Sequence, residues 1–160
     1  MPQSILDADQ TPTPWWRSKR WILFGSPLIF LLALLGFCEY SRRSYVPVAA
    51  AATQIFHQRL AQGDDELIYD ESDQAFKTSI TEETLHGYLS RIRRKLGACG
   101  YTQPAAWRVT AGNGGVIVTL DYLGYCTDGQ VQEEFVRRIA NGTQARLLHF
   151  GAASNQLLTD

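Results

Sequence analysis

An uncharged stretch of eighteen residues, from Trp21 to Cys38 (WILFGSPLIFLLALLGFC), constrains this chain more than any other feature of its sequence. As a helix it would extend about 27 Å, which is close to the hydrocarbon thickness of a bilayer. Pro27 falls in the second turn, where the loss of a backbone hydrogen bond costs least. We therefore predict a transmembrane helix over 21–38, preceded by a short tail over 1–20.

The residues beside this stretch predict its orientation. Cations are slightly more numerous before it than after it, which favours a cytoplasmic N-terminus and an exported C-terminal domain. These cations are Arg17, Lys19 and Arg20 on one side and Arg42 and Arg43 on the other. A cleaved signal peptide or a lipidated Cys38 is the alternative, but Phe37 is bulky where such cleavage sites need a small residue.

Composition limits what the rest of the chain can be. Hydrophobic residues make up 45% of the 160 residues, too many for a disordered chain, and a net charge of −1 provides no basic surface for nucleic acid. Three cysteines are too few for a disulfide-rich scaffold or a zinc site made of thiolates alone. We expect a linker over 39–47, one domain over 48–153 and a short tail over 154–160.

The first half of this domain has the spacing of helices. Apolar residues recur on one helical face from Val48 until Gly63 provides a stop, and the acidic residues 64–66 open a short helix that runs to about Asp70. A third helix is capped by Ser79 or Thr81 and ends at Gly97. Its predicted buried face consists of Leu85, Tyr88, Leu89, Ile92 and Leu96.

The second half alternates with a period of two, as strands do. Strands are predicted over 101–110, 115–126, 130–140 and 143–152. Asp128-Gly129 and Asn141-Gly142 are two-residue hairpin signals between them. The sequence therefore predicts an α+β domain, a cystatin-like roll in which three helices pack on a four-stranded antiparallel meander.

Turns centred on these dipeptides predict a strand register. The expected facing pairs are Val118 with Ile139, Tyr122 with Phe135, Phe135 with Leu148, and Arg137 with Arg146. A first hairpin centred on Gly112-Asn113 keeps its apolar residues on one face and sets Cys99 opposite Cys126. Because an exported domain lies in an oxidising compartment, we predict a Cys99–Cys126 disulfide. Two free buried thiols are the alternative, which a cytoplasmic orientation would favour.

Several short motifs resemble those of a known class of bacterial domains. They are Gly63-Asp64, Tyr69, Phe76, Leu96-Gly97, Asp121-Tyr122, Glu134-Phe135, Asn141-Gly142 and Phe150. In this arrangement the chain resembles nuclear-transport-factor-2-like, or cystatin-like, membrane-anchored bacterial domains of unknown function over residues 50–153. A tryptophan expected on the last strand is absent, and Ala145 or its neighbour stands there. The resemblance implies this fold and a single-pass protein of the bacterial inner membrane with a periplasmic domain.

The apolar face of the predicted sheet is the candidate ligand pocket. Its residues are Trp107, Tyr122, Glu133, Phe135, Arg137, Arg146 and Phe150. Arg137 and Arg146, placed together beside Glu133, can bind an anionic ligand or a partner's acid. Alternatively, the end of the sheet extends past the helices and leaves these groups in water.

We expect neither a catalytic residue nor a cofactor or metal. The three histidines, His57, His86 and His149, lie beside the predicted buried stripes or on the opposite face of the sheet. No nucleophile elbow, phosphate-binding loop or metal-ligand spacing occurs in the sequence.

The opposite face of the sheet is more apolar than free exposure requires, and it is the candidate interface. Its residues are Ile117, Leu123, Val136 and Leu147. The sequence predicts a non-catalytic membrane protein that is an accessory or assembly subunit of a membrane or envelope complex. Small-ligand binding between helices and sheet is the alternative. Expected partners are the lipid bilayer and other subunits or a second copy, but not nucleic acid.

Overall fold

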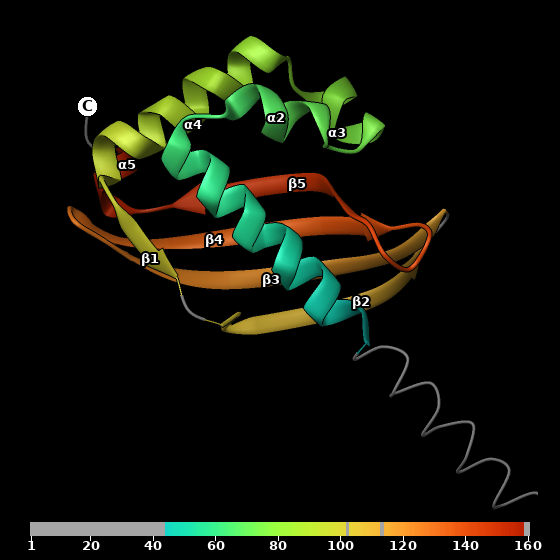
Figure 1. Ribbon diagram of the computed structural model, residues 1–160. Coiled ribbons are helices and arrows are strands. Elements are labelled where there is room, and N and C mark those ends of the chain that lie inside the picture. Colours follow the sequence, from blue (N-terminus) through green and yellow to red (C-terminus); the bar gives the residue numbers. More distant parts are fainter. Residues whose placement is uncertain (1–43, 102, 113, 159–160) are drawn as a thin grey trace, which may run out of the picture. The chain divides into compact units, whose positions relative to one another are not determined.

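The computed structural model describes residues 44–101, 103–112 and 114–158, which form helices packed on one face of an antiparallel sheet (Figure 1). A long helix over 44–62 comes first. It is followed by α2 (Asp65–Asp70), α3 (Gln74–Ser79), α4 (Glu82–Leu96), β1 (Cys99–Tyr101), β2 (Ala106–Gly112), β3 (Gly115–Cys126), β4 (Gly129–Ile139), β5 (Ala145–Ala153) and α5 (Asn155–Leu158). The predicted α+β class is confirmed.

The predicted transmembrane helix and the tail before it lie outside the described residues. Among the residues that are described, no helix is both long and apolar enough to cross a membrane. Residues 44–47, which the sequence assigned to a linker, are already helical, and residues 155–158 of the predicted tail form α5.

Local capping decides between the two predicted starts of the helix that ends at Gly97. The Thr81 hydroxyl accepts a hydrogen bond from the backbone N–H of Thr84 and caps α4, as one of the two alternatives predicted, whereas Ser79 is the last residue of α3. The helix α3 was not predicted. Asp73 caps this six-residue helix by accepting from the backbone N–H of Ala75 at 2.9 Å.

The sheet has the strand order β1-β3-β4-β5, and β2 also pairs with β3. The predicted strand over 101–110 is therefore two short strands on the same edge of β3. Cys99 faces Cys126 as predicted. Trp107 faces Leu120 and Val109 faces Val118, whereas the hairpin centred on Gly112-Asn113 would pair them with Val118 and Val116. The register changes between β1 and β2, so one constant offset could not describe both.

The registers of the other two hairpins also differ from the predictions. Tyr122 faces Glu133 rather than Phe135, because the β3–β4 turn lies one residue earlier than Asp128-Gly129 and leaves Cys126 paired with Gly129. Between β4 and β5, Phe135 faces Phe150 rather than Leu148. A shift of two residues preserves which face of the sheet each side chain occupies.

A β-bulge in β5 has the largest consequence for the predicted site. Val136 faces His149 but Arg137 faces Leu147, so Leu148 is an extra residue between the two pairs. The bulge turns Leu147 toward the helices, where only 3% of its surface is exposed. The prediction that Leu147 belongs to the opposite face is therefore wrong.

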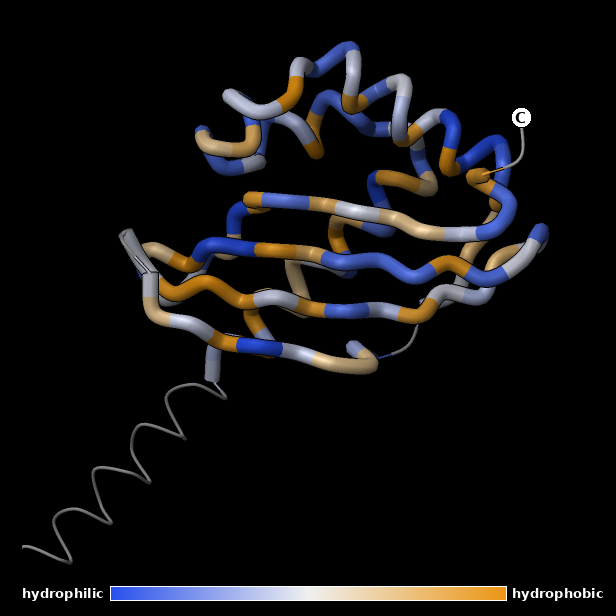
Figure 2. Tube along the Cα trace, turned by 180° about the vertical axis from the view of Figure 1, so that it is seen from behind, coloured by the Kyte–Doolittle hydropathy of each residue, from blue (hydrophilic) through white to orange (hydrophobic). Residues whose placement is uncertain are grey.

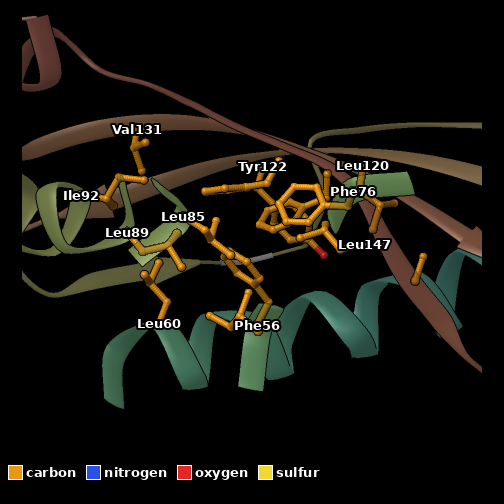
Figure 3. Close-up of a cluster of buried hydrophobic side chains, with 14 of the residues drawn as sticks. Phe56, Leu60, Phe76, Leu85, Leu89, Ile92, Leu120, Tyr122, Val131 and Leu147 are labelled. Carbon is orange, nitrogen blue, oxygen red and sulfur yellow. The ribbon is translucent and has the colours of Figure 1, made fainter. Parts of the chain in front are cut away.

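The core lies between the sheet and the helices. Figure 3 shows Phe56 and Leu60 of the long helix directed at side chains from α4 and the sheet. The predicted face of α4 is buried at Leu85, Leu89, Ile92 and Leu96. From the other side, hydrophobic and hydrophilic segments alternate along the strands, as expected for a sheet covered on one face (Figure 2).

Candidate functional site

Three aromatic residues of the predicted pocket belong to the hydrophobic core and fill the space where the pocket was predicted. Tyr122, Phe135 and Phe150 are buried, and the ring centroids of Phe135 and Phe150 lie 5.0 Å apart. Phe56 packs edge-on against Phe135 at 5.0 Å between centroids. These rings form a close-packed core, since such separations are those of aromatic rings in contact.

Two other predicted pocket residues lie elsewhere. Trp107 is 45% exposed, because it sits on the edge strand β2, where six of seven residues are exposed. Arg146 is exposed and faces Arg138 rather than Arg137, because the bulge at Leu148 shifts the end of β5 by one residue. The expected pair of adjacent guanidiniums on the apolar face does not form.

Glu133 is the centre of a buried polar cluster that the sequence analysis did not predict. Its side chain is fully buried, and both carboxylate oxygens are engaged. His57 Nε2 lies 2.7 Å from Oε2, and the Tyr101 hydroxyl donates to Oε1 at 2.9 Å. The imidazole and phenol rings stack 3.6 Å apart and nearly parallel. The signal in the sequence was Glu133 itself, because an acid at a core-facing strand position requires partners.

The carboxylate also changes the titration of its phenol partner. Burial, the negative charge of Glu133 and the hydrogen bond to it all raise the pKa of Tyr101, with burial the largest cause. Burial likewise raises the pKa of Tyr122. Tyr101 is therefore a hydrogen-bond donor throughout the physiological pH range and not a proton acceptor.

A pocket of about 300 Å³ lies against this cluster. It is bounded by the long helix, α4 and the segment that leads into β1. His57 and Tyr101 form part of its wall together with Leu60, Ala61, Ile92, Arg93, Gly97, Ala98 and Cys99. The imidazole held by Glu133 thus lies at a recess large enough for a small molecule, which is the arrangement expected of a ligand site.

Arg137 occupies the core four residues beyond Glu133 on β4. It is 4% exposed, and its guanidinium donates from Nε to Thr53 Oγ1 at 3.0 Å, from Nη2 to the Ala52 carbonyl at 3.1 Å and from Nη1 to the Ala145 carbonyl at 3.3 Å. Burial lowers the pKa of Arg137 to about 10. It joins the long helix to the two strands beneath it.

The remaining histidines have different surroundings. His86 Nδ1 lies 2.7 Å from Oδ2 of the buried Asp65, which Arg93 also engages through both of its terminal nitrogens. His149 is exposed and 4.0 Å from Glu134. In the described ranges, no group of three or more His, Cys, Asp or Glu side chains is arranged to hold a metal ion.

Three of the four residues of the candidate interface lie on the predicted face of the sheet. Ile117, Leu123 and Val136 lie on the sheet face opposite the helices and are partly buried. They are accompanied there by the charged side chains of Asp121 and Glu134, so this face is mixed and not continuously apolar.

The structure contains the predicted disulfide. Cys99 and Cys126 face each other on β1 and β3 and are bonded, with a sequence separation of 27. This bond fixes β1 against β3 beside the recess at Tyr101.

Comparison with known proteins finds similarity among the solved structures. The chain is similar to a solved structure titled as a variant of Rd1NTF2_05, a designed nuclear-transport-factor-2-like protein, with 13% identity and a TM-score of 0.40 over 71% of this chain and 96% of that one. No protein-family model and no curated protein matches the sequence.

Proposed function

We propose that this chain is a non-catalytic, single-pass protein of the bacterial inner membrane whose domain is exported and serves as an accessory or assembly subunit of a membrane or envelope complex. The observation that carries the proposal is the Cys99–Cys126 disulfide in a domain that follows an uncharged eighteen-residue stretch. Disulfides persist in oxidising compartments, and the stretch has the length of a membrane span.

The buried acids fit a structural role in the domain. Glu133 is engaged by His57 and Tyr101, and Asp65 by Arg93 and His86. These carboxylates are turned inward and satisfied by protein groups. Such clusters stabilise one arrangement of the domain, as a docking module requires.

Crosslinking mass spectrometry of the natively expressed, gently solubilised full chain tests this proposal. We expect stoichiometric crosslinks from the domain to other membrane subunits, with Val136→Arg removing those that involve the sheet face. Gln58→Arg, which adds the same charge at an exposed position of the long helix, is the control and leaves them unchanged. Crosslinks only between copies of this chain would contradict the accessory-subunit proposal and indicate a homodimer.

A second candidate function is the binding of a small molecule, and the 300 Å³ pocket beside His57 and Tyr101 favours it. Native mass spectrometry of the purified chain is the test. Ala61→Trp fills the pocket, whereas Ala51→Trp places the same side chain on an exposed part of the same helix. We expect a co-purifying molecule with the wild type and Ala51→Trp, but not with Ala61→Trp. Equal occupancy in all three proteins would exclude this pocket.

A further inference from the structure

Arg137 is a buried cation for which the described residues supply no carboxylate partner. Its three hydrogen-bond acceptors are the Thr53 hydroxyl and two backbone carbonyls, all of them uncharged. Among the other buried ionic groups, Asp65 contacts Arg93 and Asp73 contacts Arg138, while the Glu133 carboxylate is hydrogen-bonded to His57 and Tyr101. Arg137 therefore lacks a counter-ion. A buried charge without an opposite charge beside it is costly, so a bound anion would stabilise this group.

Two N–H groups of the Arg137 guanidinium make none of its hydrogen bonds to the described residues of the domain. The guanidinium has five N–H groups, and three of them account for the three hydrogen bonds within the domain. One N–H on each terminal nitrogen remains. Two such groups in one plane match the two oxygens of a carboxylate.

A small cavity adjoins this group. It has a volume of about 60 Å³, and Arg137 lines it together with Ala52, Ala145 and the apolar side chains of Phe56, Ile68 and Leu147. A single water needs roughly 10–15 Å³ of such space, so the cavity has room for several waters or for one very small molecule.

The other charged residues that line the cavity are compatible with an anion bound there. Arg59 and Glu71 form an ion pair, with 2.7 Å between Arg59 Nη1 and Glu71 Oε2. The guanidinium of Arg59 offsets the acid beside it. The net charge of the groups that line the cavity is therefore +1, from Arg137.

We propose that the cavity at Arg137 is a binding site for a small monocarboxylate with a short aliphatic chain. The carboxylate supplies the counter-ion that Arg137 lacks, and the chain occupies the apolar wall formed by Ile68 and Leu147. The volume excludes larger acids and sugar phosphates. This site is separate from the pocket at His57 and independent of the function proposed above.

Titration of the ¹⁵N-labelled full chain in detergent micelles with sodium propionate, followed by NMR, tests the proposal. We expect saturable shifts at the Ala52 and Ala145 amides and at the Arg137 Nε–H signal. The affinity should be in the millimolar range, because the ligand has few atoms. Propionamide, which has the same shape without the charge, and sodium chloride at equal ionic strength should produce no saturable shift.

Three variants make the test decisive. Arg137→Gln should weaken propionate binding about tenfold or more, since a charge-assisted hydrogen bond is lost, while Arg146→Gln on the next strand is the matched control and binds like the wild type. If Arg137→Gln does not fold, Ala145→Val decides, because it keeps the arginine but fills the cavity and should abolish binding. Absence of saturable shifts in the wild type, or equal binding by Ala145→Val, would overturn the proposal.

Discussion

Glu133 connects three elements that are distant in the sequence. Its carboxylate lies on β4, the imidazole it holds comes from the long helix, and the phenol comes from β1. A buried carboxylate with two donors is stable in this core, and the same carboxylate without them would be strongly destabilising. The buried Glu133 carboxylate therefore holds His57 in place at the pocket, although Glu133 itself does not line that pocket.

Removing the histidine should expose this dependence. We expect His57→Ala to lower the free energy of unfolding by about 3–5 kcal/mol, because it leaves the carboxylate buried with one donor fewer. His149→Ala is the control, since that imidazole is exposed, and should change stability by less than about 0.5 kcal/mol. Thermal unfolding of the full chain in mild detergent measures both. Equal effects of the two variants would mean that the His57–Glu133 contact contributes little.

Tyr101 should make the domain sensitive to alkaline pH. Its pKa in the fold is raised from the ordinary 10.0, so above that pH the unfolded chain loses a proton that the folded chain retains. The free energy of unfolding should therefore fall as the pH rises above about 10. Arg137, whose pKa is lowered to about 10, acts in the opposite direction over the same range.

The variant Tyr101→Phe separates these two effects. It removes the phenol and keeps Arg137, so its unfolding free energy should decline less between pH about 8 and about 11 than that of the wild type. Denaturant titrations at several pH values measure the difference. Identical slopes in the two proteins would show that Tyr101 ionises in the fold as it does in the unfolded chain.

At the scale of the elements, the sequence determined the face of each strand residue better than its partner. Tyr122 and Phe135 lie on the buried face as predicted, although their partners are two residues away from the expected ones. Alternation of apolar and polar residues specifies only odd or even positions, so shifts of two residues satisfy it equally well. The disulfide partners were correct because β1 keeps the predicted register while β2 does not.

The bulge in β5 is the reason that the candidate site was only partly predictable. A single extra residue, Leu148, brings Leu147 into the core and separates Arg146 from Arg137. No dipeptide in this strand signals an irregularity of this kind. The pairing of His57 with Glu133 was also beyond reach, because it depends on how the long helix crosses the sheet and not on any local pattern.

Gly124 shows how closely β1 approaches β3 at the site. A Cβ atom at this position would come within 2.6 Å of the Tyr101 ring and 2.7 Å of a Val131 methyl. We expect Gly124→Ala to destabilise the domain by about 1–3 kcal/mol, because the displaced ring loses its hydrogen bond to Glu133. Gly87→Ala is the control. Apart from its chain neighbours and the nearby backbone of α4, no atom lies within 4 Å of its added Cβ, and the change should stabilise the helix by about 0.5–1 kcal/mol.

At the scale of the whole molecule, the proposed membrane span and the disulfide depend on each other. Cys99 and Cys126 are bonded in the structure, and structural disulfides occur mainly where the surroundings are oxidising. An anchor with a cytoplasmic N-terminus would carry the domain across the membrane into such surroundings. The same two cysteines in a domain retained in the cytoplasm should be free thiols.

Deletion of residues 21–38 tests this dependence. Rapid treatment with a maleimide adds mass to each free thiol. We expect the full chain to be modified only at Cys38. The Cys38→Ser variant should not be modified at all. The shortened chain lacks the proposed membrane span, so we expect both Cys99 and Cys126 to be modified. Prior reduction should make the two proteins differ only by the Cys38 label. An unmodified shortened chain would show that the bond forms without export, and modification of Cys99 and Cys126 in the full chain would place the domain in the cytoplasm.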